Sequence, residues 1–376
     1  MKSARLILVP LIALLTMGGV TAQSTDLTFF LTFVPNIQFA PLYVAIEKGY
    51  FADEGINLVI EHGDEPLGVD LIAANQRQFG MVSGEQVITA RANGRPVVFV
   101  YEWFQAYPVG IVAPVDSGIT TVEDLRGRVV GIPGRFGASY SGMTALLSAN
   151  NMTEQDIQLE EIGFNAPEAV CVGRVEASVV YSNNEPLQIE NRAAAGDCGT
   201  VTGVTVIPVA DAADMVSNGI VTNEETIANN PELVAAVVRA FDHGLRDTIN
   251  NPAEAYLIST AYVENLPMSY DLRLGLENVS ADQAEWLLAT PDAARADITA
   301  RRVDALVTLA ERSSADELIQ FAILLETIEY WDADELGVST LDSWQVTQAT
   351  LMQMGYLSTP LDLEAAFTNA FLPENP

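Results

Sequence analysis

The chain has 376 residues, about half of them hydrophobic, and its 18 basic residues stand against 50 acidic ones, giving a net charge of −32. A surface this acidic repels nucleic acid and anionic lipid headgroups, so neither is an expected partner. The length exceeds what one compact core usually buries, and it predicts two lobes.

The first residues have the pattern of a secretion signal. Lys2 and Arg5 precede an apolar stretch at 6–20, which small residues suited to cleavage follow. The stretch is short for a membrane-spanning helix, although its retention as an anchor stays open. No cysteine follows that could be acylated, since the first is Cys171. We expect residues 1–22 to be a signal peptide and the protein to be periplasmic or membrane-associated.

Cysteine and histidine are too few to suggest a metal centre. Cys171 and Cys198 are the only cysteines, and His62 and His243 are the only histidines. The two cysteines could form a disulfide in an oxidising compartment, but the sequence leaves their pairing open. Because no CxxC or Cys/His ligand spacing occurs, we expect no metal site.

Strands and helices alternate along the first hundred residues. Runs rich in β-branched and aromatic residues predict strands, and apolar residues at helical spacing predict helices between them. The predicted strands are 26–33, 56–61, 79–82 and 97–103, and the predicted helices are 41–48, 68–75 and 86–93. Such alternation implies crossover connections and largely parallel sheets flanked by helices. We assign residues 26–112 to the first part of lobe 1.

Residues 113–206 are predicted to form lobe 2. Thr121, with Asp124 three residues on, is typical of the start of a helix. Further apolar runs predict strands at 129–132, 159–162 and 177–181, with a helix at 141–150.

The chain is then expected to return to lobe 1. The apolar run at 205–209 is interpreted as the returning strand, so that 207–376 completes lobe 1 and adds a helical C-terminal region. Amphipathic stretches in this region predict helices at 233–245, 297–311 and 316–330.

From Phe33 onward the sequence resembles the substrate-binding proteins of the NMT1/THI5-like superfamily. The matching blocks are APLYVAIEKGYF at 40–51, EGI at 54–56, NGRPVV at 93–98, the stretch 121–131, GRVEA at 173–177, and the segments 336–337, 354–357 and 367–373. They cover nearly all of the chain after the signal. Receptors for riboflavin and for thiamine-precursor pyrimidines are the nearest branches. The resemblance implies an α/β, type II periplasmic-binding-protein fold, with two α/β lobes, a hinge and a helical C-terminal region.

Polar and aromatic residues follow the predicted strands of lobe 1, where ligands of open α/β sheets bind. The candidates are Asn36, Gln38, Ser83, Glu85, Trp103 and Tyr107. Amide side chains can match the donors and acceptors at the rim of a heterocycle, and aromatic rings can stack on its faces. Helix capping for the polar residues and core packing for the aromatic ones stay open as alternatives.

Lobe 2 offers two further groups of candidates. The loop 134–141 carries Arg135, Ser139 and Tyr140, and it joins a strand to a helix, so its backbone N–H groups could bind an anion or a carbonyl oxygen. It lacks the Gly-Lys-Ser/Thr of a P-loop. The second group is Tyr181, Asn183 and Glu185. A tyrosine followed closely by a carboxylate resembles the pyrimidine receptors, in which the acid accepts from a ligand N–H.

Enzymatic chemistry is not expected. The superfamily includes fungal pyrimidine synthases, whose chemistry needs a Schiff-base lysine, a histidine and a cysteine-rich iron motif. Here Arg77 stands where the lysine is expected, 81–89 has no histidine, and 206–222 has no cysteine. Lys48 is the only lysine after the signal. A Gly-x-Ser-x-Gly elbow is also missing. We expect no cofactor.

The sequence therefore predicts an extracytoplasmic receptor of an ABC importer, which delivers a flat N-heteroaromatic vitamin to a membrane permease served by a separate ATPase subunit. Riboflavin is favoured, because several aromatic and neutral amide side chains suit a large uncharged ring. A thiamine-precursor pyrimidine, hydroxymethylpyrimidine or formylaminopyrimidine, is the alternative that Tyr181 and Glu185 favour. A pyrimidine synthase and a structural surface protein are more remote alternatives.

Overall fold

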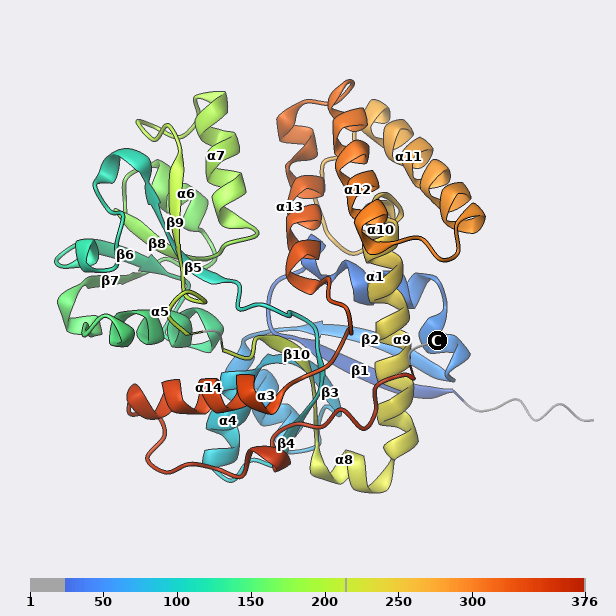
Figure 1. The fold of residues 1–376 in the computed structure, drawn as a ribbon, viewed down its shortest axis with the longest axis horizontal. Coiled ribbons are helices and arrows are strands. Elements are labelled where there is room, and N and C mark those ends of the chain that lie inside the picture. The colour runs from blue at the N-terminus through green and yellow to red at the C-terminus, as the bar shows by residue number, and fades with distance from the viewer. Residues whose placement is uncertain (1–23, 214, 375–376) are drawn as a thin grey trace, which may run out of the picture.

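The computed structural model describes residues 24–213 and 215–374, and it shows two α/β lobes lying side by side (Figure 1). The predicted signal peptide at 1–22 lies outside the described residues. Among the helices of the described ranges, none combines the length and apolar character that crossing a bilayer requires.

A five-stranded sheet forms the centre of lobe 1, in the order β2-β1-β3-β10-β4. Strand β1 pairs in parallel with β2 and β3, whereas β10 runs antiparallel between β3 and β4. The strands are β1 (Thr25–Leu31), β2 (Ile56–His62), β3 (Phe79–Ser83), β4 (Val97–Glu102) and β10 (Asn218–Asn223). Helices α1 (Ala40–Glu47), α2 (Tyr50–Asp53), α3 (Glu65–Ala73) and α4 (Gly84–Ala92) connect the first four strands. The alternation predicted for this part of the chain is confirmed.

Lobe 2 is built on a second five-stranded sheet, in the order β7-β6-β8-β5-β9. Its strands are β5 (Val109–Pro114), β6 (Val129–Ile132), β7 (Gln158–Glu161), β8 (Ala177–Tyr181) and β9 (Val204–Pro208). Its helices are α5 (Gly137–Ala149), α6 (Ala166–Cys171) and α7 (Glu185–Ala195). The chain passes between the two sheets at 103–108 and again through 209–213 and 215–217, and these segments form the hinge between the lobes.

The strand that returns the chain to lobe 1 is not the predicted one. We assigned this role to 205–209, but β9 pairs antiparallel with β5 in the second sheet, and β10 makes the return. The predicted lobe limits at 112–113 and 206–207 therefore fall inside β5 and β9. Both β9 and β10 are short runs of β-forming residues, so composition alone does not say which sheet each one joins.

Two helices predicted in lobe 2 differ from those of the structure. The stretch at Thr121 forms only one 3-10 turn, at Glu123–Leu125, and the Asp124 carboxylate accepts from the backbone N–H of Thr121. Helix α5 begins at Gly137 instead of 141, so five of the eight residues of the expected loop 134–141 are helical.

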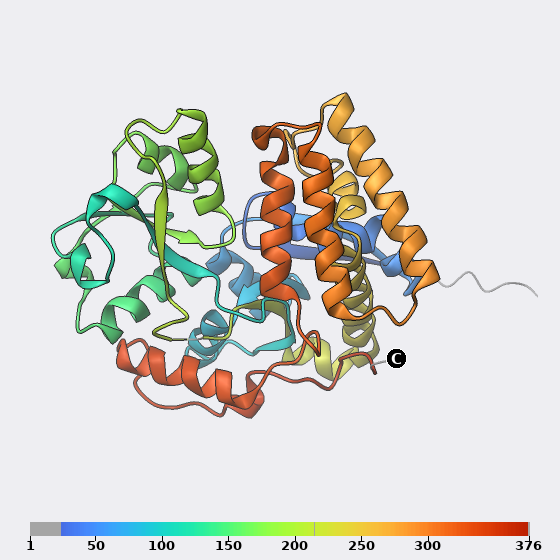
Figure 2. The same cartoon turned by 45° about the horizontal axis from the view of Figure 1, so that its top comes forward.

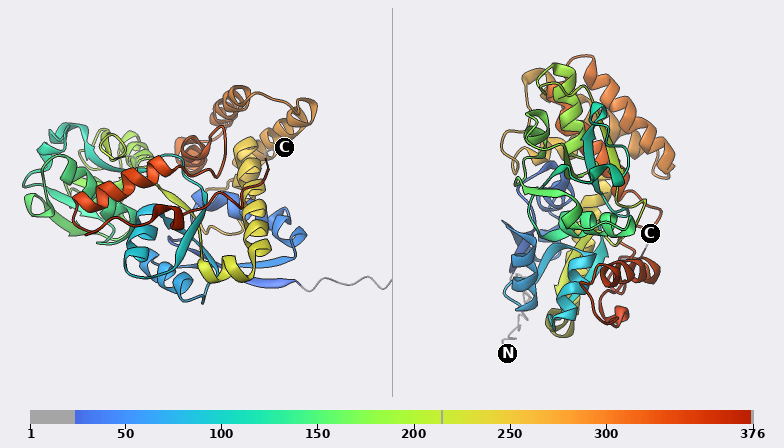
Figure 3. Two further views of the ribbon diagram at one scale, coloured as in Figure 1. Left: turned by 60° about the horizontal axis from the view of Figure 1, so that its bottom comes forward. Right: turned by 90° about the vertical axis from the view of Figure 1, so that its left-hand side faces the viewer.

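The C-terminal region is helical, as predicted. It comprises α8 (Glu224–Asn229), α9 (Pro231–Asn250), α10 (Pro252–Ser259), α11 (Tyr270–Ala289), α12 (Arg295–Ala310), α13 (Ala315–Trp331) and α14 (Leu341–Gln353). Figure 2 shows α11, α12 and α13 side by side on lobe 1. Helix α9 packs closely along α1, since a Cβ at Gly244 would overlap the carbonyl oxygen of Pro41. Helix α14, drawn in red, contacts α4 of lobe 1 and α5 of lobe 2 (Figure 3).

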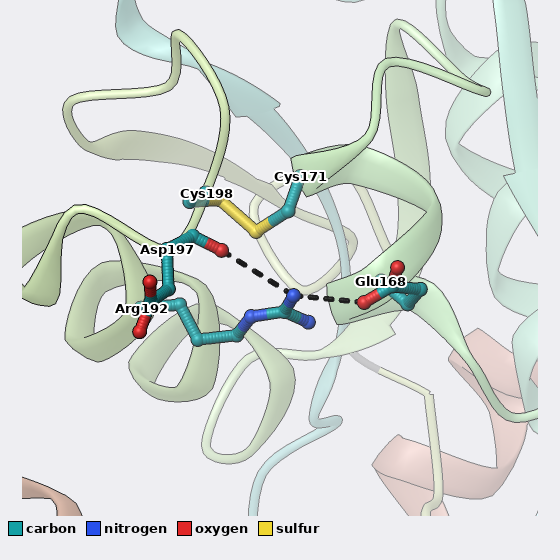
Figure 4. The surroundings of a disulfide bond; sticks show 5 residues. All are labelled: Glu168, Cys171, Arg192, Asp197 and Cys198. Carbon is teal, nitrogen blue, oxygen red and sulfur yellow. Dashed lines mark hydrogen bonds and ion pairs between the residues drawn. A yellow bond between two sulfur atoms is a disulfide. The ribbon is translucent and has the colours of Figure 1, made fainter.

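A disulfide fastens the outer part of lobe 2. It joins Cys171 at the end of α6 to Cys198 beyond α7, across 27 residues of sequence (Figure 4). Beside it, Arg192 donates to Glu168 and to the carbonyl oxygen of Asp197. The sequence left this pairing open, and the structure shows it.

Removing the disulfide should destabilise the protein, because cross-linking a loop of this length removes conformational entropy from the unfolded chain. The double substitution Cys171→Ser, Cys198→Ser should lower the free energy of unfolding by about 3 kcal/mol. Urea unfolding with and without a reducing agent measures this. The native protein should respond to the reductant and the double variant should not, and equal midpoints for the two oxidised proteins would contradict the expectation.

Candidate ligand-binding site

A cleft lies between the lobes, where the ends of several strands from both sheets meet. Its lining comes from segments after β1, β2 and β4 in lobe 1, and after β6, β7 and β8 in lobe 2. The empty space within this lining, its open mouth included, is ≈ 940 Å³. This position is typical of a site for a small molecule.

Aromatic rings form much of the cleft in lobe 1. Trp103 stacks on Phe39, with ring centroids 5.8 Å apart, and on Trp331, at 5.3 Å. Phe104 meets Trp103 edge-on at 4.8 Å. The indole Nε1 of Trp103 is buried and finds no hydrogen-bond partner within residues 24–213 and 215–374. Since a buried donor is normally paired, this unpaired N–H is an exception in the cleft wall.

Glu185 brings a carboxylate to the wall of the cleft in lobe 2. One of its oxygens accepts from the backbone N–H of Tyr181 at 2.8 Å, and the other from Asn184 Nδ2 at 3.1 Å. Burial raises the pKa of Glu185 to about 7, against the lowering effect of the hydrogen bond from Tyr181. The side chain can therefore exchange a proton near neutral pH, and it can accept from a ligand N–H.

Two further carboxyl groups, of Glu65 and Glu85, share the hydroxyl of Ser83. Its Oγ lies 2.6 Å from Glu65 Oε1 and 2.7 Å from Glu85 Oε1. One hydroxyl donates one proton, so the other contact requires a proton on a carboxyl group. Burial, and next the charge of Glu65, raise the pKa of Glu85 to about 8. Glu65 also accepts from the backbone N–H groups of Ser83 and Ala138. We therefore assign the proton to Glu85 and the negative charge to Glu65.

Hydrogen bonds also cross the cleft and hold the lobes together. The buried amide of Asn183, in lobe 2, donates to Thr327 Oγ1 at 2.8 Å and to Gln38 Oε1 at 3.3 Å. The hydroxyl of Tyr181 donates to Asn218 Oδ1 at 3.0 Å. The structure thus shows the two lobes in contact.

Five of the twelve predicted site residues line the cleft, namely Gln38, Trp103, Ser139, Tyr181 and Glu185. Ser83, Glu85 and Asn183 lie behind this lining, in the hydrogen bonds just described. Asn36 caps the 3-10 turn Ile37–Phe39 by accepting from the backbone N–H of Gln38, which is the alternative that the sequence left open. Tyr107 is buried and donates to the carbonyl oxygen of Ala138.

Arg135 and Tyr140 lie away from the cleft lining. Arg135 forms ion pairs with Glu154 and Glu161. Tyr140 donates to Glu154 at 2.8 Å and stacks on Tyr356. The Arg135 side chain points toward these acidic residues because they offer it ion-pair partners at the surface. We propose no ligand contact for either residue.

Several lining residues were not predicted. They are Phe33, Phe39, Glu65, Phe164 and Asn218. Glu65 follows the strand β2 by three residues, so the strand-end rule that selected Gln38 could have selected it too. Asn218 begins β10, the strand that the sequence did not identify.

Comparison with known proteins agrees with this architecture. The model of the NMT1/THI5 like family matches residues 36–255. Riboflavin-binding protein RibY of Chloroflexus aurantiacus is 33% identical over 94% of this chain and 88% of its own length. A 4-amino-5-hydroxymethyl-2-methylpyrimidine phosphate synthase of Legionella pneumophila is 26% identical over 63% of this chain and 74% of its own length.

Solved structures share the fold. The ligand-binding component of an ABC-type import system from Staphylococcus aureus superposes with a TM-score of 0.59 at 11% identity, over 93% of this chain and 98% of its own. With this agreement, the two lobes and the hinge constitute a periplasmic-binding-protein fold.

The neutral Glu85 should make stability depend on pH. A carboxyl whose pKa is raised in the folded state contributes most stability below its unfolded value of 4.5, and this contribution is lost as the pH rises through about 8. Glu85→Gln keeps the shape without the proton equilibrium. Relative to the native protein, this variant should gain stability between pH 4.5 and pH 8, by up to about 1.4 kcal/mol per pH unit.

Urea unfolding at half-unit pH steps measures this difference, with the exposed Glu123→Gln as the matched control. A difference between Glu85→Gln and the native protein that stays constant over the range would contradict the assignment of the proton.

Proposed function

The chain belongs to the NMT1/THI5-like family, and we propose that it is an extracytoplasmic solute-binding receptor of an ABC importer, with riboflavin as its ligand. The observation that carries the proposal is the aromatic cleft between two hinged lobes, around Trp103. The likeness to a riboflavin-binding protein over almost the whole chain supports the choice of ligand. A large flat ring with polar groups at its rim matches stacked side chains bordered by amide and carboxyl groups.

In this proposal the isoalloxazine ring lies among the aromatic side chains of the two lobes. Trp103 Nε1 donates to a carbonyl oxygen of the ring, and Glu185 accepts from its imide N–H. Gln38 and Ser139 offer further polar groups in the lining. The pair with Trp103 satisfies an N–H that otherwise lacks a partner, and the pair with Glu185 adds a ligand donor to a carboxylate that already accepts from Tyr181 and Asn184.

Closure of the lobes follows from the same contacts. The segments 103–108, 209–213 and 215–217 act as the hinge, and ligand bound to both lobes favours the closed arrangement, in which Asn183 reaches Thr327. A membrane permease then distinguishes the closed receptor from the open one. ATP hydrolysis belongs to a separate subunit of the importer.

A pyrimidine precursor of thiamine is the second candidate, because Tyr181 and Glu185 come together at the cleft wall. Catalysis on such a pyrimidine is not proposed. Arg77, at the position expected for a catalytic lysine, pairs with Glu61 outside the lining. Lys48 pairs with Asp247 and Glu254, also outside it.

Titration of riboflavin into the purified, flavin-free protein should quench flavin fluorescence with saturation. Glu185→Gln should weaken this binding at least about tenfold, because an amide cannot replace both acceptor oxygens of the carboxylate. Glu190→Gln, an exposed position on the same helix α7, is the matched control and should bind like the native protein.

Hydroxymethylpyrimidine serves as the competing ligand. If it bound and riboflavin did not, the second candidate would replace the first. Unchanged riboflavin affinity in Glu185→Gln would remove this residue from the site.

A further inference from the structure

The start of helix α5 points to the kind of ligand that the cleft admits. A strand-to-helix junction of this sort commonly binds an anion, because its free N–H groups and the helix dipole favour negative charge. Here the protein places its own carboxylate there. Glu65, from lobe 1, accepts from the backbone N–H of Ala138, and its Oε2 lies so close to Gly137 that a Cβ there would overlap it.

The position of Glu65 is fixed from several sides. Its side chain is buried, with 5% exposure, and it accepts from the backbone N–H of Ser83 at 2.7 Å and the hydroxyl at 2.6 Å. Gly137 has a φ of +63°, a left-handed conformation that suits glycine and leaves room for the carboxylate. Glu65 is thus held over the first turn of α5 and occupies the place of an anion.

Compensating positive charge is lacking in the cleft. Among the described residues that line it, only Glu65 and Glu185 are ionisable acids, and none is Lys, Arg or His. The nearest arginine in sequence to α5, Arg135, is paired with Glu154 and Glu161. An anionic group at this end of the cleft would therefore face a carboxylate without any cation to offset it.

We propose that Glu65 restricts the cleft to ligands without an anionic group, so that uncharged riboflavin is bound and its phosphate ester, FMN, is rejected. This inference rests on the proposed function for the identity of the ring, and it adds the residue that selects against the phosphorylated form. The site of selection is the first turn of α5, where Glu65 replaces the anion.

Fluorescence titration of the full chain with riboflavin and with FMN tests this. The native protein should bind FMN at least about 100-fold more weakly than riboflavin. Glu65→Ser vacates the start of α5, and Glu65→Gln removes the charge while keeping the shape. Both should reduce the ratio of the two dissociation constants, the serine variant at least about tenfold. Asp64→Asn removes a charge one residue away, at an exposed position, and should leave the ratio unchanged.

Two results would overturn the role of Glu65, namely FMN binding to the native protein about as tightly as riboflavin, or a ratio that neither Glu65 variant alters. Binding of neither flavin would instead reject the proposed ligand. In that case the role of Glu65 is tested by the melting temperature in inorganic phosphate, compared with chloride at the same ionic strength. Phosphate should raise the melting temperature of Glu65→Ser and not that of the native protein, and the absence of this difference would reject the role of Glu65.

Discussion

The carboxylate of Glu65 joins the two lobes at the base of the cleft. Glu65 belongs to lobe 1 and follows β2 in the chain. Its carboxylate accepts a hydrogen bond from the backbone N–H of Ala138, at the start of α5 in lobe 2. Taking a charge out of water is costly unless hydrogen bonds replace the lost hydration. Burial raises the pKa of Glu65, and the donors from Ser83 and Ala138 offset part of this effect. If the lobes separate as proposed, the donor from Ala138 is withdrawn. The proposed closure would then be coupled to the ionic state of this residue.

The cleft also contains a polar group that the closed protein leaves without a partner. The indole N–H of Trp103 is buried in a stack of aromatic rings, where an unmade hydrogen bond costs about 1–3 kcal/mol. The same rings exclude water and give the cleft its flat faces. A ligand that accepts from this N–H removes this cost and retains the stacking. The closed protein is therefore more stable with such a ligand bound than it is when empty.

How well the sequence predicts a feature of this structure depends on how far apart in the chain the interacting residues are. The alternation of strands and helices in lobe 1 was readable because each element has its own local pattern, and the residues after strand ends, such as Gln38 and Trp103, followed from that reading. The return strand was misassigned because β9 and β10 are alike in composition and differ only in their partners. Trp331 stacks on a ring 228 positions earlier in the chain, and no local pattern announces such a contact.

The acidity of the chain explains why the cleft holds no cation. With 50 acidic residues to 18 basic ones, arginines readily find carboxylates at the surface, and the ion pairs of Arg77 and Arg135 are examples. A receptor for an anion would need to keep a cation away from these partners, for instance by burial. Arg302 is the arginine with the least exposed side chain among the ion pairs of the described residues, at 3%, and it is bound to Glu329 and Asp332, outside the lining. In a chain of this composition, an uncharged ring is the kind of ligand that requires the least charge rearrangement, since stacking and neutral hydrogen bonds do not compete with the surface acids.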